Sequence, residues 1–280
     1  MHCDCYKKQQ IMKYAKCSEN NIVDSLRNSS NLFGYQISNR GIKGDITLAR
    51  EFIASGRVGH YMACANPHSL VVASRDTAFS SSLKEADLLL PDGVGILIAT
   101  KVLKLPIAER VAGYEFFRGL TTQLARNGGA RYFFLGSSDH VLDLISKKLN
   151  KEFPEITVCG TLSPPFKPEF SDEDNVAIVA AINAARPDVL WVGLTAPKQE
   201  KWIYAHRDKL HVPLCGAIGA VFDFYAGTKE RSSVIWQRLG LEWLLRFLKE
   251  PKRLWERNMK SAPIFLWWVA REKVRRIVRS

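Results

Sequence analysis

Residues 86–95 read Ala-Asp-Leu-Leu-Leu-Pro-Asp-Gly-Val-Gly, an apolar run that ends in a carboxylate between proline and glycine. The three leucines are typical of a buried parallel strand, and residues 94–102, rich in Val, Ile, Leu and Ala, predict a helix. Asp92 therefore lies at the carboxyl end of a strand and beside a helix N-terminus, where open α/β sheets bind their ligands. At this point, capping of the helix explains Asp92 equally well.

Short apolar strands alternate with amphipathic helices from Tyr35 onward. This alternation predicts an α/β fold, with a Rossmann-like, mostly parallel sheet and helices on both faces. Strands are expected at residues 61–65, 87–90, 131–135, 156–159, 188–193 and 214–218. We expect three regions along the chain: a weakly ordered N-terminal extension (1–33), an α/β catalytic domain (34–227), and a basic, Trp-rich helical appendage (228–280). Within the appendage, helices are expected at 234–249 and 252–260.

The formal charge of +12 is concentrated in the appendage, because residues 229–280 hold 14 Lys or Arg against 5 Asp or Glu. A basic tail suits nucleic acid, an anionic membrane surface or a phosphorylated substrate. The ten apolar or small residues 261–270 are too few to cross a bilayer but suit lying on one. Their tryptophans disfavour a contact that only follows DNA phosphates. We therefore expect a membrane-associating appendage and no nucleic-acid partner, with a helix packed on the domain as the alternative.

Polar residues follow four of the predicted strands. They are Asn66-Pro67-His68-Ser69, Pro91-Asp92-Gly93, residues 193–200 (Gly-Leu-Thr-Ala-Pro-Lys-Gln-Glu) and residues 219–224 (Gly-Ala-Val-Phe-Asp-Phe). The carboxyl ends of parallel strands share one edge of a sheet, so we expect the four groups to converge on one site. Taken singly, each group is also explained by helix capping.

The characteristic motifs of several enzyme classes are absent from this sequence. There is no G-x-G-x-x-G or P-loop motif, which argues against a dinucleotide oxidoreductase and an ordinary NTPase. No H-E-x-x-H or G-x-S-x-G is present, so zinc and serine hydrolases are not expected. Asp172-Glu173-Asp174 has the D-x-D spelling of many metal-dependent sugar transferases, but it follows Ser171 and predicts a capped helix start. The six cysteines show no C-x-x-C spacing, as in a reduced cytoplasmic protein.

Five motifs in order along the chain resemble one family. They are Pro91-Asp92-Gly93-x-Gly95, Glu109-Arg110-Val111-x-Gly113, Ala196-Pro197-Lys198-Gln199-Glu200, Gly219-x-x-Phe222-Asp223-Phe224-x-Ala226-Gly227 and Gly240-Leu241-Glu242-Trp243-Leu244-x-Arg246. From about Tyr35 to Arg257 the chain resembles the WecG/TagA/CpsF glycosyltransferases. It departs from them at Cys64, where members commonly have threonine, and at Glu115, where aspartate is usual.

This resemblance implies an inverting, metal-independent transferase without a cofactor. It moves a sugar from UDP-N-acetylmannosamine, its uronic acid or UDP-glucose to an undecaprenyl-diphosphate-linked glycan acceptor. Such enzymes are peripheral at the cytoplasmic face of the membrane, in cell-surface polysaccharide synthesis, including exopolysaccharide biosynthesis. The resemblance makes Asp92 the general base. The substrate-binding residues that it implies are Asn66, Arg110, Lys198, Gln199, Asp223, Arg246, Arg253 and Arg257.

Two other functions remain open from the sequence. The chain could be a catalytically inactive nucleotide- or lipid-binding module that kept the fold, although the presence of Asp92, Arg110 and Gln199 counts against this. It could also be a basic nucleic-acid-binding protein. Salt-sensitive DNA binding that survives loss of Asp92 would identify the second alternative.

Overall fold

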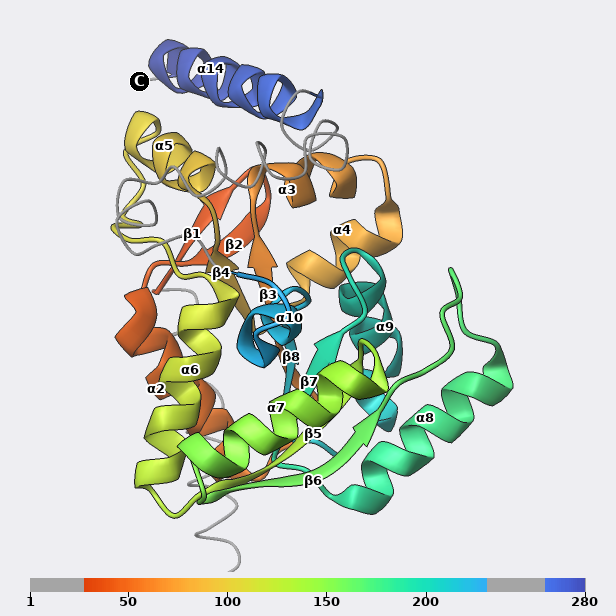
Figure 1. The fold of residues 1–280 in the computed structure, drawn as a ribbon. Helices are drawn as coiled ribbons and strands as arrows, with labels where there is room; N and C mark the ends of the chain where they lie inside the picture. Colours follow the sequence, from red (N-terminus) through yellow and green to blue (C-terminus); the bar gives the residue numbers. More distant parts are fainter. Residues whose placement is uncertain (1–27, 231–259, 280) are drawn as a thin grey trace, which may run out of the picture.

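A six-stranded parallel sheet forms the centre of the protein (Figure 1). The computed structural model describes residues 28–230 and 260–279. The strands are β3 (His60–Ala65), β4 (Leu88–Pro91), β5 (Ala130–Gly136), β6 (Ile156–Leu162), β7 (Val189–Gly193) and β8 (Leu214–Ala217). Their order across the sheet is β4-β3-β8-β7-β5-β6, and every neighbouring pair is parallel. The predicted α/β, Rossmann-like fold is confirmed, and each of the six predicted strands is present.

Helices cover both faces of the sheet (Figure 1). One layer consists of α2 (Gly41–Ser55), α6 (Gly113–Arg126), α7 (Asp139–Glu152) and α10 (Val221–Ala226). The other layer consists of α3 (Pro67–Ala73), α4 (Thr77–Lys84), α8 (Asp172–Ala185) and α9 (Lys198–His206), with the short 3-10 helix η1 (Arg207–Lys209) after it. Helix α5 (Val94–Val102) packs beside the edge strand β4. The sequence did not predict α4, α10 or η1.

The two layers arise because successive residues of a strand face opposite sides of the sheet. In β3, Tyr61 packs into the cluster that contains Trp202, whereas Met62 packs into the cluster that contains Phe117. Trp191 of β7 is fully buried, and the neighbouring strand carries Gly216, where an added Cβ would lie only 2.3 Å from the indole ring. A glycine at this position is therefore required to seat Trp191 in the core.

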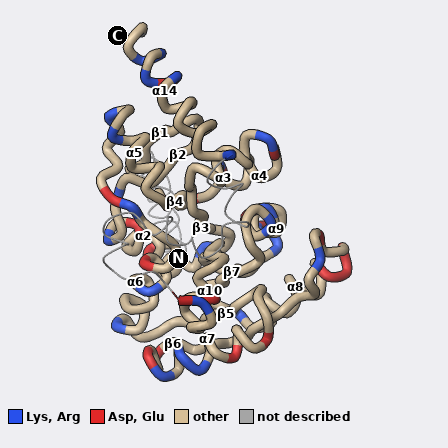
Figure 2. Tube along the Cα trace, turned by 45° about the horizontal axis from the view of Figure 1, so that its top comes forward, with Lys and Arg blue, Asp and Glu red and all other residues tan. Residues whose placement is uncertain are grey.

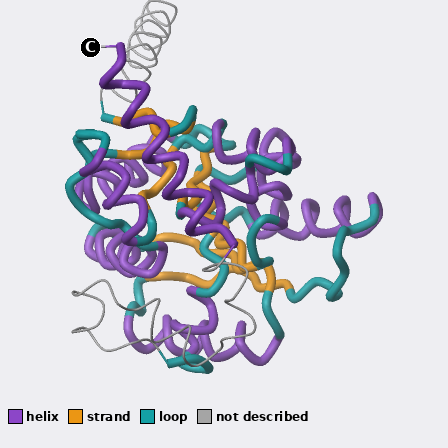
Figure 3. The backbone as a smooth tube through the Cα atoms, turned by 90° about the horizontal axis from the view of Figure 1, so that it is seen from above, coloured by secondary structure: helices purple, strands orange, loops and turns teal. Residues whose placement is uncertain are grey.

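A hairpin and the last helix form a third layer beyond β4. Strands β1 (Ser29–Leu32) and β2 (Tyr35–Ser38) pair around a turn at Phe33-Gly34. Helix α14 (Ser261–Arg279) buries Phe265 and Val269 in the same cluster as this hairpin. Helix α14 packs against α3 and α5, above which it lies in Figure 1, and Figure 3 shows it from above, running inward from the C-terminus. The predicted helical appendage is thus present at residues 261–279, while the helices expected at 234–249 and 252–260 lie outside the described residues.

Candidate active site

Asp92 is held at the end of β4 by backbone hydrogen bonds on both sides. Its N–H donates to the carbonyl of Ala65 on β3 at 2.8 Å, and the preceding carbonyl, of Pro91, accepts from Val111 N–H at 2.9 Å. Gly93, with φ +92°, occupies the N-cap of α5 and has no side chain to cap it. Asp92 therefore precedes the cap, and its carboxylate, 28% exposed, reaches the surface of this edge.

Arg110 brings a positive charge to Asp92. Its Nη1 lies 4.0 Å from Asp92 Oδ1, and both side chains are partly buried. Both neighbours of Arg110 are anchored: Val111 by the bond to Pro91, and Glu109 by accepting the Ile42 N–H at 2.6 Å. This second anchor lies at the start of α2, where a carboxylate also complements the helix dipole. The loop that carries Arg110 is thus fixed over the end of β4.

The end of β3 carries Asn66 and Cys64. Asn66 Oδ1 caps α3 by accepting the Ser69 N–H at 2.9 Å, which leaves the amide nitrogen as a donor at this edge. Cys64 packs under the loop after Arg110, since an added Cβ at Gly113 would lie 3.6 Å from its Sγ. Burial, and then the nearby carboxylates of Asp92 and Glu200, raise the pKa of the Cys64 thiol well above its ordinary value. Cys64 therefore stays a neutral thiol between these two carboxyl groups.

The ends of β7 and β8 meet at Gln199. It lies in the first turn of α9 and is buried, with its Nε2 donating to Glu200 Oε1 at 2.9 Å. An added Cβ at Gly219, the residue with φ +47° after β8, would lie 3.1 Å from Gln199 Oε1. Burial raises the pKa of Glu200 to about 7. Gln199 and Glu200 therefore form a buried, hydrogen-bonded pair beside the carboxyl ends of β7 and β8.

The four predicted strand ends do converge. Strands β4, β3, β8 and β7 are consecutive neighbours in the sheet, so their carboxyl ends form one continuous edge. Asp92, Asn66, Gly219 and Gln199 each follow one of these ends. Cys64, at the end of β3, lies close enough to Asp92 and to Glu200 for both carboxyl groups to contribute, after burial, to the raised pKa of its thiol.

Of the other predicted site residues, Lys198 and Asp223 make the contacts below, and three arginines lie outside the described chain. The Lys198 ammonium donates to the Lys167 carbonyl at 2.6 Å and lies 3.5 Å from the Phe170 ring centre, on the segment between β6 and α8. Asp223, in α10, accepts from Lys229 Nζ at 2.8 Å. The predicted residues Arg246, Arg253 and Arg257 lie outside the described residues.

Asp172-Glu173-Asp174 begins a helix, as predicted. Ser171 is the N-cap of α8, and its hydroxyl accepts from the Asp174 N–H while Asp174 Oδ2 accepts from the Ser171 N–H. Asp174 also pairs with Lys167 at 2.8 Å. Within residues 28–230 and 260–279, no three His, Cys, Asp or Glu side chains gather in a metal-binding arrangement.

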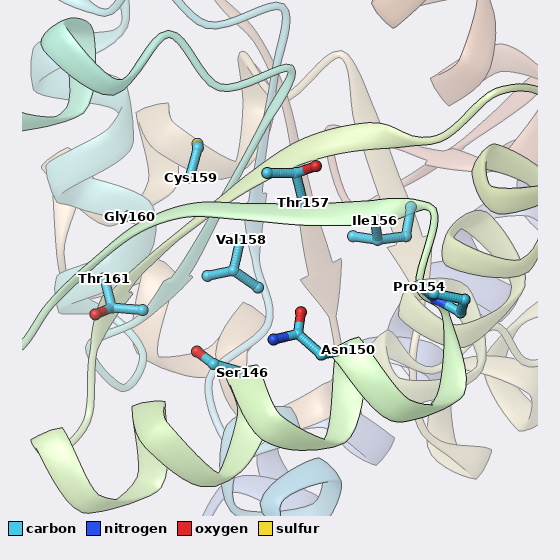
Figure 4. Close-up of a pocket in the computed structure, with 9 residues that line it drawn as sticks. All are labelled: Ser146, Asn150, Pro154, Ile156, Thr157, Val158, Cys159, Gly160 and Thr161. Atoms are coloured by element: carbon cyan, nitrogen blue, oxygen red, sulfur yellow. The ribbon is translucent and has the colours of Figure 1, made fainter.

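One surface hollow of the described chain lies away from this edge. It measures about 540 Å³ and lies between α7 and the edge strand β6. Figure 4 shows Ser146 and Asn150 pointing toward β6, and Val158 pointing toward α7. No charged side chain lines this hollow, so it offers neither a carboxylate to take a proton nor a cation to bind a diphosphate. A smaller hollow of about 180 Å³, lined in part by Glu109, lies beside the loop of Arg110.

Sequence reasoning passed over Glu200 as a site residue. Its charge and its place in the first turn of α9 favour an exposed, dipole-complementing role. The signal that could have revealed its burial is the spacing to Ile203, three residues on, which places both side chains on the inward face of α9.

The arrangement suits displacement at a carbon that carries an anionic leaving group. Asp92 supplies a carboxylate that can take a proton, Arg110 supplies a cation beside it, and Asn66 and Gln199 supply neutral hydrogen-bonding groups. A proton acceptor next to a fixed cation is the combination that transfer from a diphosphate donor needs.

Comparison with known proteins agrees with this chemistry. Residues 30–279 match the Glycosyl transferase WecG/TagA/CpsF family. A similar curated protein is the N-acetylglucosaminyldiphosphoundecaprenol N-acetyl-beta-D-mannosaminyltransferase of Bacillus spizizenii, 30% identical over 74% of this chain and 77% of the relative. The protein of the same name from Staphylococcus aureus strain MW2 is 28% identical over 76% of this chain and 80% of the relative. The chain therefore belongs to the WecG/TagA/CpsF family of glycosyltransferases.

Proposed function

We propose that this protein transfers N-acetylmannosamine from its UDP-linked form to an undecaprenyl-diphosphate-linked N-acetylglucosamine acceptor, with inversion at the anomeric carbon. The observation that carries the proposal is the pairing of Asp92 with Arg110 at the edge where β4, β3, β8 and β7 end. The names of the relatives support the transferred sugar and the acceptor.

In the proposed reaction Asp92 removes the proton of the attacking acceptor hydroxyl. The hydroxyl oxygen forms a bond to the anomeric carbon as the bond to the diphosphate oxygen breaks on the opposite face, and UDP leaves with the bonding electrons. Arg110 stabilises the negative charge that develops on this diphosphate. A single displacement of this kind inverts the configuration, and Asn66 and Gln199 hold polar groups of the donor.

A donor screen tests the proposed substrate. Purified protein is mixed with a short polyprenyl-diphosphate-N-acetylglucosamine and, in separate reactions, UDP-N-acetylmannosamine, its uronic acid or UDP-glucose, and released UDP is measured. We expect the N-acetylmannosamine donor to give a kcat/KM at least about tenfold above the others, because a site built to hydrogen-bond one sugar leaves polar groups unpaired with another. Preference for another sugar would correct the donor, and absence of UDP release from every donor would refute the proposal.

We also propose that α14 holds the protein at the cytoplasmic face of the membrane. Its inward face carries Phe265 and Val269, while Trp267 and Val274, two turns apart on the opposite face, are 57% and 60% exposed. Further exposed apolar side chains on this helix are Leu266, Ile277 and Val278. Figure 2 shows basic residues in the C-terminal half of α14. An exposed apolar stripe bordered by cations is the pattern of a helix that lies in a lipid interface.

The placement of α14 supports this assignment. The hydroxyl oxygen of its first residue, Ser261, lies 2.8 Å from His68 Nδ1 on α3, the helix that Asn66 caps. A membrane bound along the outer face of α14 therefore lies near the edge that carries Asp92, where a lipid-linked acceptor is needed. In the described residues no helix is both long and apolar enough to span a bilayer.

The double substitution Trp267→Glu with Val274→Glu tests the membrane face. We expect it to weaken binding to vesicles containing anionic lipid by at least about tenfold, because two apolar side chains no longer enter the interface. Sedimentation with vesicles measures this binding. Val176→Glu is the matched control, since Val176 is 70% exposed on α8, away from α14. Equal vesicle binding by the double variant and the wild type would exclude this face of α14 as the membrane contact.

A further inference from the structure

A buried amide and a buried carboxyl group lie side by side at the end of β7, and the proposed displacement assigns no task to the carboxyl group. Gln199 is 5% exposed and Glu200 is 3% exposed. Gln199 Nε2 donates to Glu200 Oε1 at 2.9 Å. The remaining polar atom of each side chain, Gln199 Oε1 and Glu200 Oε2, is buried and has no hydrogen-bond partner in the described part of the chain. Such groups cost stability and require an explanation.

Packing does not explain the carboxyl group of Glu200. Burial raises its pKa to about 7, so the folded protein disfavours the charged form. The neighbouring cation, Lys201, pairs with Asp76, the N-cap of α4, at 3.1 Å instead. An apolar side chain of similar volume would fill the same space without this cost.

The hydrogen bond from Gln199 selects one orientation of its amide. An amide side chain can turn over and exchange its donor for its acceptor, but Glu200 Oε1 holds the nitrogen on its own side. The amide lies against Gly219, where an added Cβ would be 3.1 Å from Oε1 and 3.4 Å from Nε2. This places an unsatisfied acceptor at the turn after β8, on the edge that also carries Asp92.

We infer that Glu200 is a positioning residue, whose carboxyl group fixes the Gln199 amide so that its oxygen accepts a hydrogen bond from a hydroxyl or N–H group of the nucleotide-sugar donor. The inference rests on the proposed function. It explains both unusual features of the pair. The buried carboxyl group of Glu200 supplies the oxygen that accepts from the Gln199 amide nitrogen, and the Gln199 oxygen lacks a protein partner because the substrate supplies one.

Two substitutions at Glu200 separate positioning from packing. Glu200→Met keeps the volume but removes the acceptor, and Glu200→Gln keeps an acceptor oxygen. We expect Glu200→Met to raise the donor KM about tenfold with kcat within about twofold, while the thermal midpoint stays equal or rises. We expect Glu200→Gln to restore most of the donor affinity. A role in packing alone would leave the donor KM of a stably folded Glu200→Met protein unchanged, which would overturn the inference.

A cycle with Gln199 shows whether Glu200 acts through it. Gln199→Ala should raise the donor KM by a similar factor, and the double variant Gln199→Ala with Glu200→Met should be no worse. Independent, multiplying effects would overturn the inference.

Asp45→Asn is the matched control, because Asp45 is another buried carboxyl group with an unsatisfied oxygen but lies on α2. This substitution should leave the donor KM unchanged. A wild-type protein without sugar transfer would overturn the proposed function as well, whereas an active wild type with unaltered Glu200→Met kinetics overturns only the role of Glu200.

Discussion

Asp92→Asn is expected to lower kcat for sugar transfer by at least about 100-fold, because general-base catalysis contributes roughly 10² to 10⁴ in rate. The amide has nearly the same shape as the carboxylate but cannot take the proton of the acceptor hydroxyl. The backbone bonds that hold this residue, from its N–H to the Ala65 carbonyl and from Val111 to Pro91, do not involve the side chain. The substitution should therefore leave the site folded.

Donor affinity distinguishes loss of the base from loss of the site. Titration of the Asp92→Asn protein with the UDP-sugar, without acceptor, should give a Kd within about twofold of the wild type, since Arg110, the proposed diphosphate ligand, is unchanged. The control is Asp87→Asn, the same change at the other end of β4, where the carboxylate accepts from the Tyr61 N–H at 3.0 Å. Near-normal turnover by Asp92→Asn would refute the role of Asp92 as base.

The sheet, and the edge at which β4, β3, β8 and β7 end, could be predicted because the sequence patterns that indicate them are short and local. Each strand is a short apolar run, and polar residues with glycine or proline follow four of them. Parallel pairing then places the four ends on one edge whatever their order in the sheet. The strand order itself, with β8 between β3 and β7, depends on packing between distant segments and was not predicted.

The missed elements are those stabilised by contacts far along the chain. Strand β1 lies within residues 1–33, for which the sequence indicated little order, and three of its four residues are polar. Its Leu32 is buried because Phe265 and Val269 of α14 pack in the same cluster. Helix α4 has the weakly helical sequence Thr77–Lys84 with three consecutive serines, and depends on the Asp76 cap and the burial of Phe79.

The positions of single side chains were the least predictable part of the site. Lys198 and Gln199 are adjacent in the motif, yet one contacts Phe170 and the other faces Gly219. Consecutive residues of a helix point about 100° apart, so a motif places its members on one turn but not in one pocket. The same geometry hides the carboxyl group of Glu200, which composition alone places on the surface.

Arg110→Ala is expected to lower kcat/KM by roughly 100- to 1000-fold, the cost of removing a charge that stabilises a transition state. The guanidinium lies 4.0 Å from Asp92 and is held there by the anchors of Glu109 and Val111. Arg110→Lys should recover part of the loss, since it keeps the charge but not the planar fork that binds two phosphate oxygens together. Steady-state rates against donor concentration measure these effects.

The control for Arg110 is Arg118→Ala, which removes another cation that pairs with a carboxylate, Glu152, at 3.0 Å, but lies within α6. Arg118→Ala should leave kcat/KM within about twofold.

Combining Arg110→Ala with Asp92→Asn tests whether the two groups act in the same step of the reaction. If both act on the same transition state, the loss in the double variant is smaller than the product of the single losses, because each change alone already removes an interaction that depends on the other. Fully multiplying losses would mean that Arg110 acts in a different step from Asp92, such as binding the donor before transfer begins.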